Sequence, residues 1–420
     1  MTRRADVMVA GGGPAGLAAA VAAARNGADT LLVERYGFLG GMATAGLVSP
    51  FMGNSIGHQE LVTGIYTEIV ERLKQAGGYG GRSPSAFDAE TFKFVADDLC
   101  REAGVRLLLH AWVGEPTLRG ARITRVAVED KSGTEQVAAD IYVDATGDAD
   151  LTARAGVPCE KGRSSDGLTQ PMTLNVQVGD VDVEQMPDRH EINRHWEAAK
   201  ERGEVTNPRE NVLLFFVPTP GVVHFNTTRV VKHDATNADS LTAAEIEARR
   251  QARELLAFLH QHVRGYHHAR IVAMGTQIGV RESRRIVGGY VMTREDILRG
   301  RKFRDAVARG NYPIDIHSPT GAGTVIERPP EGDYYEIPFR CLVPQKISNV
   351  LVAGRSISTT HEAQAAVRIM PICIGLGQAA GTAAALCSQA RIKPRDLNAA
   401  RLRRRLIQQG AYLRRRTGGE

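Results

Sequence analysis

The feature that most constrains the fold is a glycine-rich turn near the N-terminus, Gly11-Gly12-Gly13-Pro14-Ala15-Gly16. An apolar run over residues 5–10 precedes it, an alanine-rich stretch over residues 17–24 follows it, and a second apolar run over residues 30–33 ends in Glu34. In a dinucleotide-binding unit with G-x-G-x-x-G spacing, the glycines form the turn, admit the pyrophosphate and let helix and strand pack closely, while the acidic residue binds a ribose. The helix N-terminus adds free N–H groups for the phosphates. The sequence therefore predicts a strand–turn–helix–strand unit that binds a dinucleotide.

Further elements of a parallel sheet follow this unit. A second glycine-rich segment, residues 37–46, is expected to be another loop close to a ligand. Apolar side chains at helical spacing predict helices over residues 58–76 and 88–104. Two or three short strands are predicted between residues 117 and 143, and a strand over residues 141–145 leads into Thr146-Gly147-Asp148. This order indicates a parallel sheet with a small β-excursion.

The doubly wound pattern is interrupted and then resumes. From about residue 165, strand-like stretches alternate with polar helical ones, and a strand typical of the first domain returns over residues 350–353. We therefore expect an α/β fold in which a mixed α/β substrate domain is inserted into a Rossmann-like nucleotide-binding domain. The expected boundaries are 1–165 for the first part of the nucleotide-binding domain, 166–335 for the inserted domain, 336–395 for the second part, and 396–420 for a basic C-terminal helix and tail.

The net charge of +6 is concentrated at the C-terminus. Residues 391–420 carry ten Lys and Arg against two acids, and this excess of +8 leaves −2 for the rest of the chain. A basic tail can attract anionic partners, but a solvated helix face with a frayed end is the simpler interpretation, so no nucleic-acid partner is expected.

Cysteine usage and hydropathy suit a protein of the cytoplasm. The five cysteines are widely spaced and include no C-x-x-C pair, so neither a metal site nor a redox-active dithiol is expected. The apolar run over residues 363–387 contains Gln, Arg and Pro, and we expect it to be a buried helix with its entry loop rather than a membrane span.

Three segments, in their order along the chain, carry a resemblance to known proteins: the N-terminal turn with Glu34, "DATGDAD" at 144–150 and "NVLVAGRSISTTHEA" at 349–363. Together they resemble the flavoprotein superfamily built on a glutathione-reductase-type FAD domain. The stretches "GVRESRRIVGGYVMT", "YPIDIH" and "YYEIPFRCLVP" narrow the resemblance to the bacterial FAD-dependent oxidoreductase family related to the flavoprotein subunits of fumarate reductase and heterodisulfide reductase. The resemblance extends over roughly the whole chain and implies that FAD is the cofactor.

The resemblance also implies which residues contact FAD. It places the pyrophosphate on the N-terminal turn, the ribose on Glu34, the adenine region beside the backbone of Val113, and the opening of a helix near the flavin at Gly377. Close helix packing is the alternative for Gly377. The implied cofactor-binding residues are Gly11, Gly13, Pro14, Ala15, Gly16, Glu34, Arg35, Gly41, Met42, Val113, Thr146, Gly147, Asp148, Gly354, Arg355, Gly377, Gln378 and Ala379.

Three side chains are candidates for catalysis. His361 either binds substrate or moves a proton, or it is a hydrogen-bonded structural histidine. Arg368 lies in an apolar segment and needs an anionic partner, which a substrate carboxylate, a flavin oxygen or an internal acid could supply. His317 is a further proton-transfer candidate, with a satisfied loop histidine as the alternative.

Other polar residues near these candidates are expected to be structural. Arg281 and Arg284 bracket Glu282, which predicts an ion-pair network that supports the FAD domain. Cys373 is expected to be an inert packing residue, as single buried cysteines usually are.

The predicted reaction depends on FAD and on the lack of a second nucleotide-binding turn. No second G-x-G-x-x-G turn follows a strand, so a separate NAD(P)H domain is not expected. We expect a bacterial FAD-dependent oxidoreductase that transfers a hydride between a small organic substrate and flavin N5. A flavin monooxygenase, an electron-transfer subunit of a larger complex and a purely structural FAD are the alternatives. A homo-oligomer or a redox partner protein is compatible with the chain.

Overall fold

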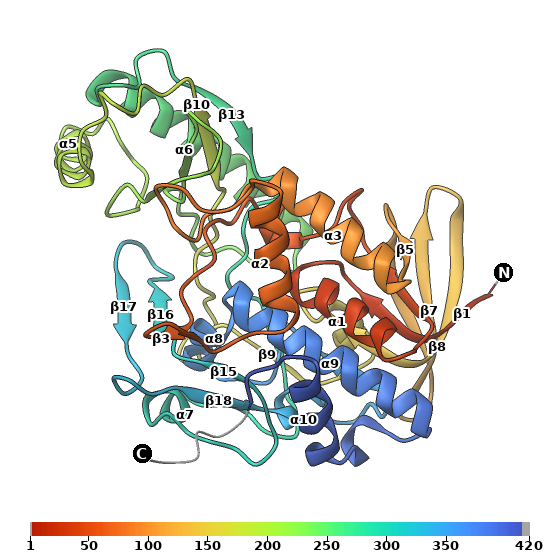
Figure 1. The fold of residues 1–420 in the computed structure, drawn as a ribbon. Helices are drawn as coiled ribbons and strands as arrows, with labels where there is room; N and C mark the ends of the chain where they lie inside the picture. The colour runs from red at the N-terminus through yellow and green to blue at the C-terminus, as the bar shows by residue number, and fades with distance from the viewer. Residues whose placement is uncertain (1, 414–420) are drawn as a thin grey trace.

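A parallel sheet forms the framework of the protein, whose computed structural model describes residues 2–413 (Figure 1). Its strands all run parallel, in the order β5-β2-β1-β8-β19. This arrangement confirms the predicted α/β fold, and it shows that a strand from the far end of the chain completes the N-terminal sheet. The five strands are β1 (Thr2–Ala10), β2 (Thr30–Val33), β5 (Arg106–Leu108), β8 (Gly133–Asp144) and β19 (Val350–Val352).

The predicted β-excursion is an antiparallel meander on one face of this sheet. It consists of β6 (Trp112–Arg119), β7 (Arg122–Asp130) and the first part of β8. Side chains alternate along β1: Val7 and Val9 join the core on the helical side, whereas Met8 and Ala10 join the core beneath the meander. Both faces of the sheet are therefore covered, as in other parallel sheets.

Two helices from opposite ends of the chain pack closely on the other face: α1 (Pro14–Arg25) and α9 (Met370–Ala390). A Cβ atom on Gly377 would lie 2.0 Å from the carbonyl oxygen of Ala15, and one on Gly381 would lie 2.0 Å from that of Ala19. Only glycine permits this approach. The long apolar run is thus a core helix: α9 is long and apolar enough to cross a membrane, but 94% of its most apolar stretch is buried inside the protein.

The helices after the second glycine-rich segment match the sequence only in part. Helix α3 (Ala89–Ala103) has Asp88 as its N-cap and Gly104 at its end, as its predicted range implies. Helix α2 (Ile65–Gln75) begins later than the predicted residue 58, because Gly64 precedes it with a φ of 75°. Upstream of Gly64 the chain instead forms a short hairpin, β3 (Ser55–Ile56) and β4 (Gln59–Glu60).

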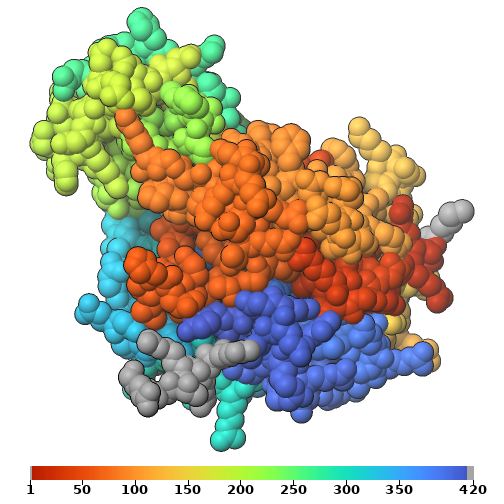
Figure 2. Space-filling model, in the orientation of Figure 1, coloured from red at the N-terminus to blue at the C-terminus, as the bar shows by residue number. Residues whose placement is uncertain are grey.

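The middle of the chain forms a separate lobe, drawn in green (Figures 1 and 2). An antiparallel sheet in the order β11-β12-β10-β13 packs against two helices, and Trp196, Phe258 and Tyr266 are buried in their shared core. Its elements are β10 (Val176–Gly179), α5 (Arg189–Glu201), β11 (Leu214–Phe216), β12 (Val223–Phe225), α6 (Ala238–His262) and β13 (Arg270–Met274).

Residues after this lobe return to the larger body. Ile297, Val307 and Ile314 belong to the same core as α9, although the sequence assigned them to the insert. The packing therefore extends the nucleotide-binding body into the range predicted for the inserted domain. The pairs here are β9 (Cys159–Lys161) with β14 (Arg284–Ile286), β15 (Ala306–Gly310) with β18 (Tyr335–Pro338), and β16 (Ile314–His317) with β17 (Thr324–Glu327).

The remaining helices are short, and they are α4 (Asp150–Arg154), α7 (Arg294–Leu298), α8 (His361–Val367) and α10 (Ala399–Gln408). Helix α10 is the predicted basic C-terminal helix, and it buries Leu402 and Leu406 while its arginines face outward or sit at its edges. The predicted tail beyond it, residues 414–420, lies outside the described residues.

Candidate active site

A single long cavity of about 480 Å³ runs from the carboxyl ends of the parallel strands to the inserted lobe. Gly11, Glu34 and Gly354, each at or just after a strand end, line one part of it. Residues of the lobe, among them Arg209 and Asn226, line the other part. Ligands of open α/β sheets bind at this edge, so the cavity lies where the fold favours a site.

The glycine turn shapes the first part of the cavity. Gly11 has a φ of 91°, and a Cβ atom there would lie 2.7 Å from the carbonyl oxygen of Ala145. A Cβ atom on Gly16 would lie 1.8 Å from the carbonyl oxygen of Gly11, so Gly16 provides the helix–strand contact and does not line the cavity. Gly13 is the N-cap of α1 and no side chain caps this helix. The N-terminal N–H groups of α1 thus open toward the cavity, beside Pro14 and Ala15 that line it.

Glu34 lies where an acceptor for a ribose is expected. Its side chain is buried, and its carboxylate accepts hydrogen bonds from the N–H groups of Gly12, at 2.6 Å, and Tyr36, at 2.9 Å. Burial raises the pKa of Glu34, against the effect of these two hydrogen bonds. Each carboxylate oxygen has a further lone pair, so the group can still accept from a ligand hydroxyl.

The outer end of this part is enclosed by aromatic and cationic side chains. The Arg35 guanidinium lies 5.4 Å from the ring centre of Trp112 and 4.9 Å from that of Tyr36. Arg35 and the Tyr36 hydroxyl both donate to the side-chain oxygen of Gln277, which comes from the segment that follows the lobe's sheet. Val113 lines the same end. Strand ends and the inserted lobe therefore meet at the position implied for adenine.

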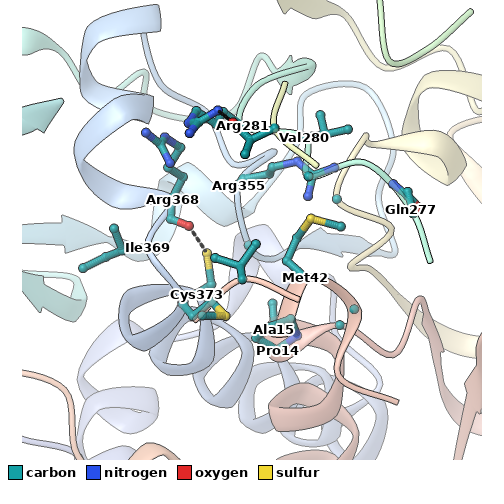
Figure 3. A pocket seen from close by; sticks show the side chains of 18 of the residues that line it. Pro14, Ala15, Met42, Gln277, Val280, Arg281, Arg355, Arg368, Ile369 and Cys373 are labelled. Carbon is teal, nitrogen blue, oxygen red and sulfur yellow. Dashed lines mark hydrogen bonds between the residues drawn. The ribbon is translucent and has the colours of Figure 1, made fainter. Parts of the chain in front are cut away.

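Five more of the implied cofactor residues line the cavity beside Gly354, and Figure 3 labels two of them, Met42 and Arg355. The other three are Gly41, Thr146 and Gly147. Asp148 does not line it. Its Oδ1 accepts from Arg355 Nη2 at 2.7 Å and from the Ser283 hydroxyl at 2.6 Å, so Asp148 positions Arg355. The Nε atom of Arg355 is buried and has no hydrogen-bond partner in the described chain.

The implied helix opening at Gly377 is wrong. Helix α9 begins at Met370, which lines the cavity together with Ile369 and Cys373, both labelled in Figure 3. Gly377, Gln378 and Ala379 lie farther along the helix and do not line the cavity. Gly377 packs on α1, and the Gln378 side chain accepts from the N–H of Ile65 at 3.1 Å. The alternative of close helix packing therefore holds for Gly377. The better signal for the helix start is Pro371, because proline is favoured in the first turn of a helix.

His361 lies outside the cavity lining. It follows the N-cap Thr360 at the start of α8, and its Nδ1 lies 2.9 Å from Glu282 Oε1. Glu282 also accepts from Arg285, which donates in turn to the carbonyl oxygens of Thr359 and Gly162. This buried network supports the structural alternative for His361.

His317 lines the cavity and is held as a neutral ring. Its Nδ1 lies 3.1 Å from Arg229 Nη2, and since a guanidinium only donates, Nδ1 accepts and the proton resides on Nε2. The Nε2 atom lies 3.6 Å from Asp315 Oδ2. Burial, together with Arg281 and Arg368 nearby, lowers the pKa of His317 far below its usual value. His317 can therefore donate a hydrogen bond from Nε2, but it is not a cationic acid.

Arg368 and Arg281 lie next to each other at the inner end of the cavity (Figure 3). Arg368 Nη2 makes only long contacts, at 3.3 Å to the Asp315 carbonyl oxygen, 3.5 Å to Gln170 Oε1 and 3.9 Å to Asp315 Oδ2. Arg281 donates to the Pro171 carbonyl at 2.8 Å and to the Thr173 hydroxyl at 2.6 Å. The predicted ion-pair network forms without Arg281.

The members of that network are Arg284, which binds Asp150 and the Asp148 carbonyl oxygen, and Arg285, which binds Glu282. Cys373 lines the cavity near Arg368, and its thiol donates to the Arg368 carbonyl at 3.3 Å (Figure 3). Burial raises the pKa of Cys373 to about 12, which keeps the thiol protonated and fits the expected inert role.

Several lining residues had no assignment from the sequence. Tyr312 and Asp315 lie in the quoted segment "YPIDIH", so their positions were indicated but their roles were not. Arg281 was expected in the ion-pair network and lines the cavity instead. Gln277 lies between Gly275 and Gly279, whose spacing does not fit a second nucleotide turn, so nothing in the sequence singled it out. Arg209 carried no signal, because an arginine in a polar segment gives no sign that the chain will bury it.

Comparisons with known proteins agree with this geometry. Residues 6–406 match the sequence family described as FAD dependent oxidoreductase. No curated protein matches the chain. Among solved structures, a geranylgeranyl bacteriochlorophyll reductase-like protein from Thermoplasma acidophilum is 14% identical over 98% of this chain and 85% of its own, with a TM-score of 0.50.

Two other structural neighbours are more distant. An anhydrotetracycline hydroxylase from Streptomyces rimosus is 14% identical over 92% of this chain and 63% of its own, with a TM-score of 0.46. A p-nitrophenol 4-monooxygenase from Pseudomonas putida is 12% identical over 96% and 82%, also with a TM-score of 0.46. At such identities a structural likeness shows a shared fold and leaves substrate and reaction open.

Proposed function

Because the chain belongs to the FAD-dependent oxidoreductase family, we propose that it transfers a hydride between FAD and a small organic substrate that binds at the inner end of the cavity. FAD supplies the redox chemistry through its flavin ring. The single observation that carries the proposal is the continuity of one cavity from the glycine turn to Arg281, Arg368 and His317. A cofactor along the first part would bring its reactive end to these polar side chains.

The residues that line the cavity at the glycine turn fit a dinucleotide, whose pyrophosphate is negatively charged. A Cβ atom at Gly11 would collide with the backbone of Ala145, so the turn can keep this conformation only with glycine at position 11. The uncapped N-terminus of α1 offers N–H groups to phosphates. The buried Nε of Arg355, without a partner in the described chain, is a donor that a bound phosphate or ribityl oxygen would satisfy.

At the inner end, the chain can orient a substrate and exclude water. Arg281 and Arg368 offer guanidinium donors, and His317 offers its Nε2–H as a neutral donor to a substrate oxygen. Ile369, lining the cavity beside them, contributes apolar surface. Asp315 Oδ2 lies 3.6 Å from His317 Nε2 and is a carboxylate at this end of the cavity that can take up a proton.

The test is to purify the protein, record its visible spectrum and screen small metabolites for anaerobic bleaching of the flavin. We expect a yellow protein, or one that becomes yellow with added FAD, and bleaching by a limited set of substrates without NAD(P)H. A colourless protein that does not take up FAD would refute the proposal. Oxygen consumption driven by NAD(P)H in the presence of substrate would instead indicate a monooxygenase, and reduction only by a captured redox protein would indicate an electron-transfer subunit.

A further inference from the structure

The inner end of the cavity contains more positive than negative charge. Four arginines gather there: Arg209, Arg281 and Arg368, which line the cavity, and Arg229 behind His317. Among the described residues two carboxylates pair with them, since Asp315 lies 3.9 Å from Arg368 and Glu210 lies 3.1 Å from Arg229. Within residues 2–413, neither Arg209 nor Arg281 has a carboxylate within ion-pair distance. The arginines at this end of the cavity therefore outnumber the carboxylates that could neutralise them.

The guanidinium groups also have donors to spare. Arg209 is only 5% exposed, yet the one hydrogen bond that its guanidinium makes in the described chain is from Nε to Asn211 Oδ1, at 3.3 Å. The Nε of Arg368 is buried and has no partner among residues 2–413, and the Nη2 contacts of Arg368 are all 3.3 Å or longer. Buried polar groups normally have hydrogen-bond partners, so these donors point to a ligand.

Burial and mutual repulsion destabilise the positive charges of these arginines. The pKa of Arg281 lies well below its usual value, mainly because the side chain is buried and also because Arg368 and Arg209 are near. Burial likewise lowers the pKa of Arg209 to about 10. Both shifts mean that the positive charges of these two arginines are destabilised where they lie, and an anion placed among them would relieve that penalty.

Apolar side chains of the lobe line the cavity close to Arg281. Leu213 and Phe215 both line it, and Leu213 accepts a backbone hydrogen bond from Asn226, whose side chain in turn accepts from Arg281 at 3.3 Å. A simple inorganic anion would leave this apolar surface without a partner, whereas a molecule with an anionic head and an apolar body would cover both.

We propose that the substrate is a small organic carboxylate whose carboxylate group is bound by Arg281 and Arg368 and whose apolar part packs against Leu213 and Phe215. A planar carboxylate matches the fork of donors on a guanidinium. Asp315, itself a carboxylate, is already the weak internal partner of Arg368, so a group of this charge and shape is accommodated there. The inference rests on the proposed function, because it takes this end of the cavity as the substrate site.

The test measures binding of benzoate to the holoenzyme, with its neutral analogue benzamide, acetate and inorganic phosphate as comparison probes. Thermal shift and perturbation of the visible flavin spectrum report binding without turnover. We expect benzoate to bind more tightly than acetate or phosphate, and benzamide to bind weakly. Arg281→Met and Arg368→Met should weaken benzoate about 10- to 100-fold, the usual effect of losing a hydrogen bond to a charged group.

Matched variants separate this role from a structural one. Arg368→Met should leave the Tm of the unliganded protein unchanged or raise it, since the side chain makes only long contacts. Arg281→Lys, which keeps a charge, should weaken benzoate less than Arg281→Met. Asp315→Asn should strengthen benzoate binding, because it removes the competing carboxylate. Arg101→Met, which deletes an exposed arginine of α3, should change nothing.

The inference would be overturned if benzoate and benzamide bound equally well. It would also be overturned if both Met variants bound benzoate as tightly as the wild type, or if phosphate bound more tightly than benzoate and acetate. These outcomes are distinct from failure of the proposed function. A yellow protein that uncharged metabolites reduce, and that benzoate leaves unaffected, would refute only the inference. A colourless protein that cannot take up FAD would refute the proposed function, while thermal shift would still report whether the carboxylate site exists.

Discussion

Gly13 offers a direct test of where the pyrophosphate binds. It is the N-cap of α1 with a φ of −66° and a ψ of −176°, which any residue can adopt. A Cβ atom there would have only Gly41 Cα nearby, at 3.8 Å, an ordinary van der Waals distance. Gly13→Asp should therefore fold. Asp is also a favoured N-cap, so the FAD-free variant should be as stable as the wild type or more stable by up to about 1 kcal/mol.

The same carboxylate should expel FAD. At about 5 Å from a phosphate charge and an effective dielectric of about 20, the repulsion is about 3 kcal/mol, or roughly a 100-fold loss of affinity. Gly13→Asn has nearly the same shape and caps the helix equally well, but it carries no charge. The ratio of FAD Kd values between the two variants, measured by flavin fluorescence on protein freed of cofactor, isolates the electrostatic effect.

Two results would contradict this reasoning. Equal FAD affinity in Gly13→Asp and Gly13→Asn would mean that the pyrophosphate does not lie at the N-terminus of α1. A large fall in the Tm of FAD-free Gly13→Asp would mean that the glycine is required for folding and not for the ligand.

Three further predictions concern packing, pH and a histidine. Gly377→Ala should destabilise the protein by about 1–3 kcal/mol in denaturant unfolding, since its Cβ atom would overlap the α1 backbone. Gly375→Ala in the same helix should cost less, because its Cβ atom would meet only side chains, those of Val62 at 3.0 Å and Ala308 at 3.9 Å. Burial, with Asp148 and Asp144 nearby, raises the pKa of Asp150 to about 6, and Asp150 lines the cavity. Ionisation of Asp150 adds a negative charge near an anionic cofactor, so FAD affinity should fall as pH rises above about 6, and Asp150→Asn should remove this dependence in titrations of FAD at several pH values. His361→Gln should lower the free energy of unfolding by about 1–3 kcal/mol, through loss of its hydrogen bond to Glu282, without altering the pH profile of flavin reduction; a changed profile would restore His361 as a catalytic residue.

The nucleotide-binding half could be predicted because its constraints are local. The glycine turn, Glu34 and the strand before Gly354 each depend on backbone geometry within a few residues, and their spacing along the chain is enough to identify them. The family and the cofactor follow from the same residues, and the matched range 6–406 agrees. The narrower relation to fumarate reductase and heterodisulfide reductase subunits remains a prediction.

The substrate half could not be predicted in the same way, because its residues come together only through tertiary packing. Arg209 from the lobe, Arg281 after it and Arg368 before α9 meet without any common spacing. Gly377, in contrast, was singled out from the sequence but given the wrong role. Glycines in a helix signal a close approach, but the sequence does not show whether a ligand or another helix approaches, and here it is α1.

The close contact between α1 and α9 has a consequence for biogenesis. The ribosome releases the glycine turn early, but the surface against which Ala15 and Ala19 pack is formed by Gly377 and Gly381, near the end of the chain. Until those residues emerge, one face of α1 and of the sheet beneath it lacks its cover, and the lobe between them must fold or be sheltered first. Cofactor capture is therefore expected to be nearly the last event of synthesis, and a nascent chain stalled before α9 should hold no FAD.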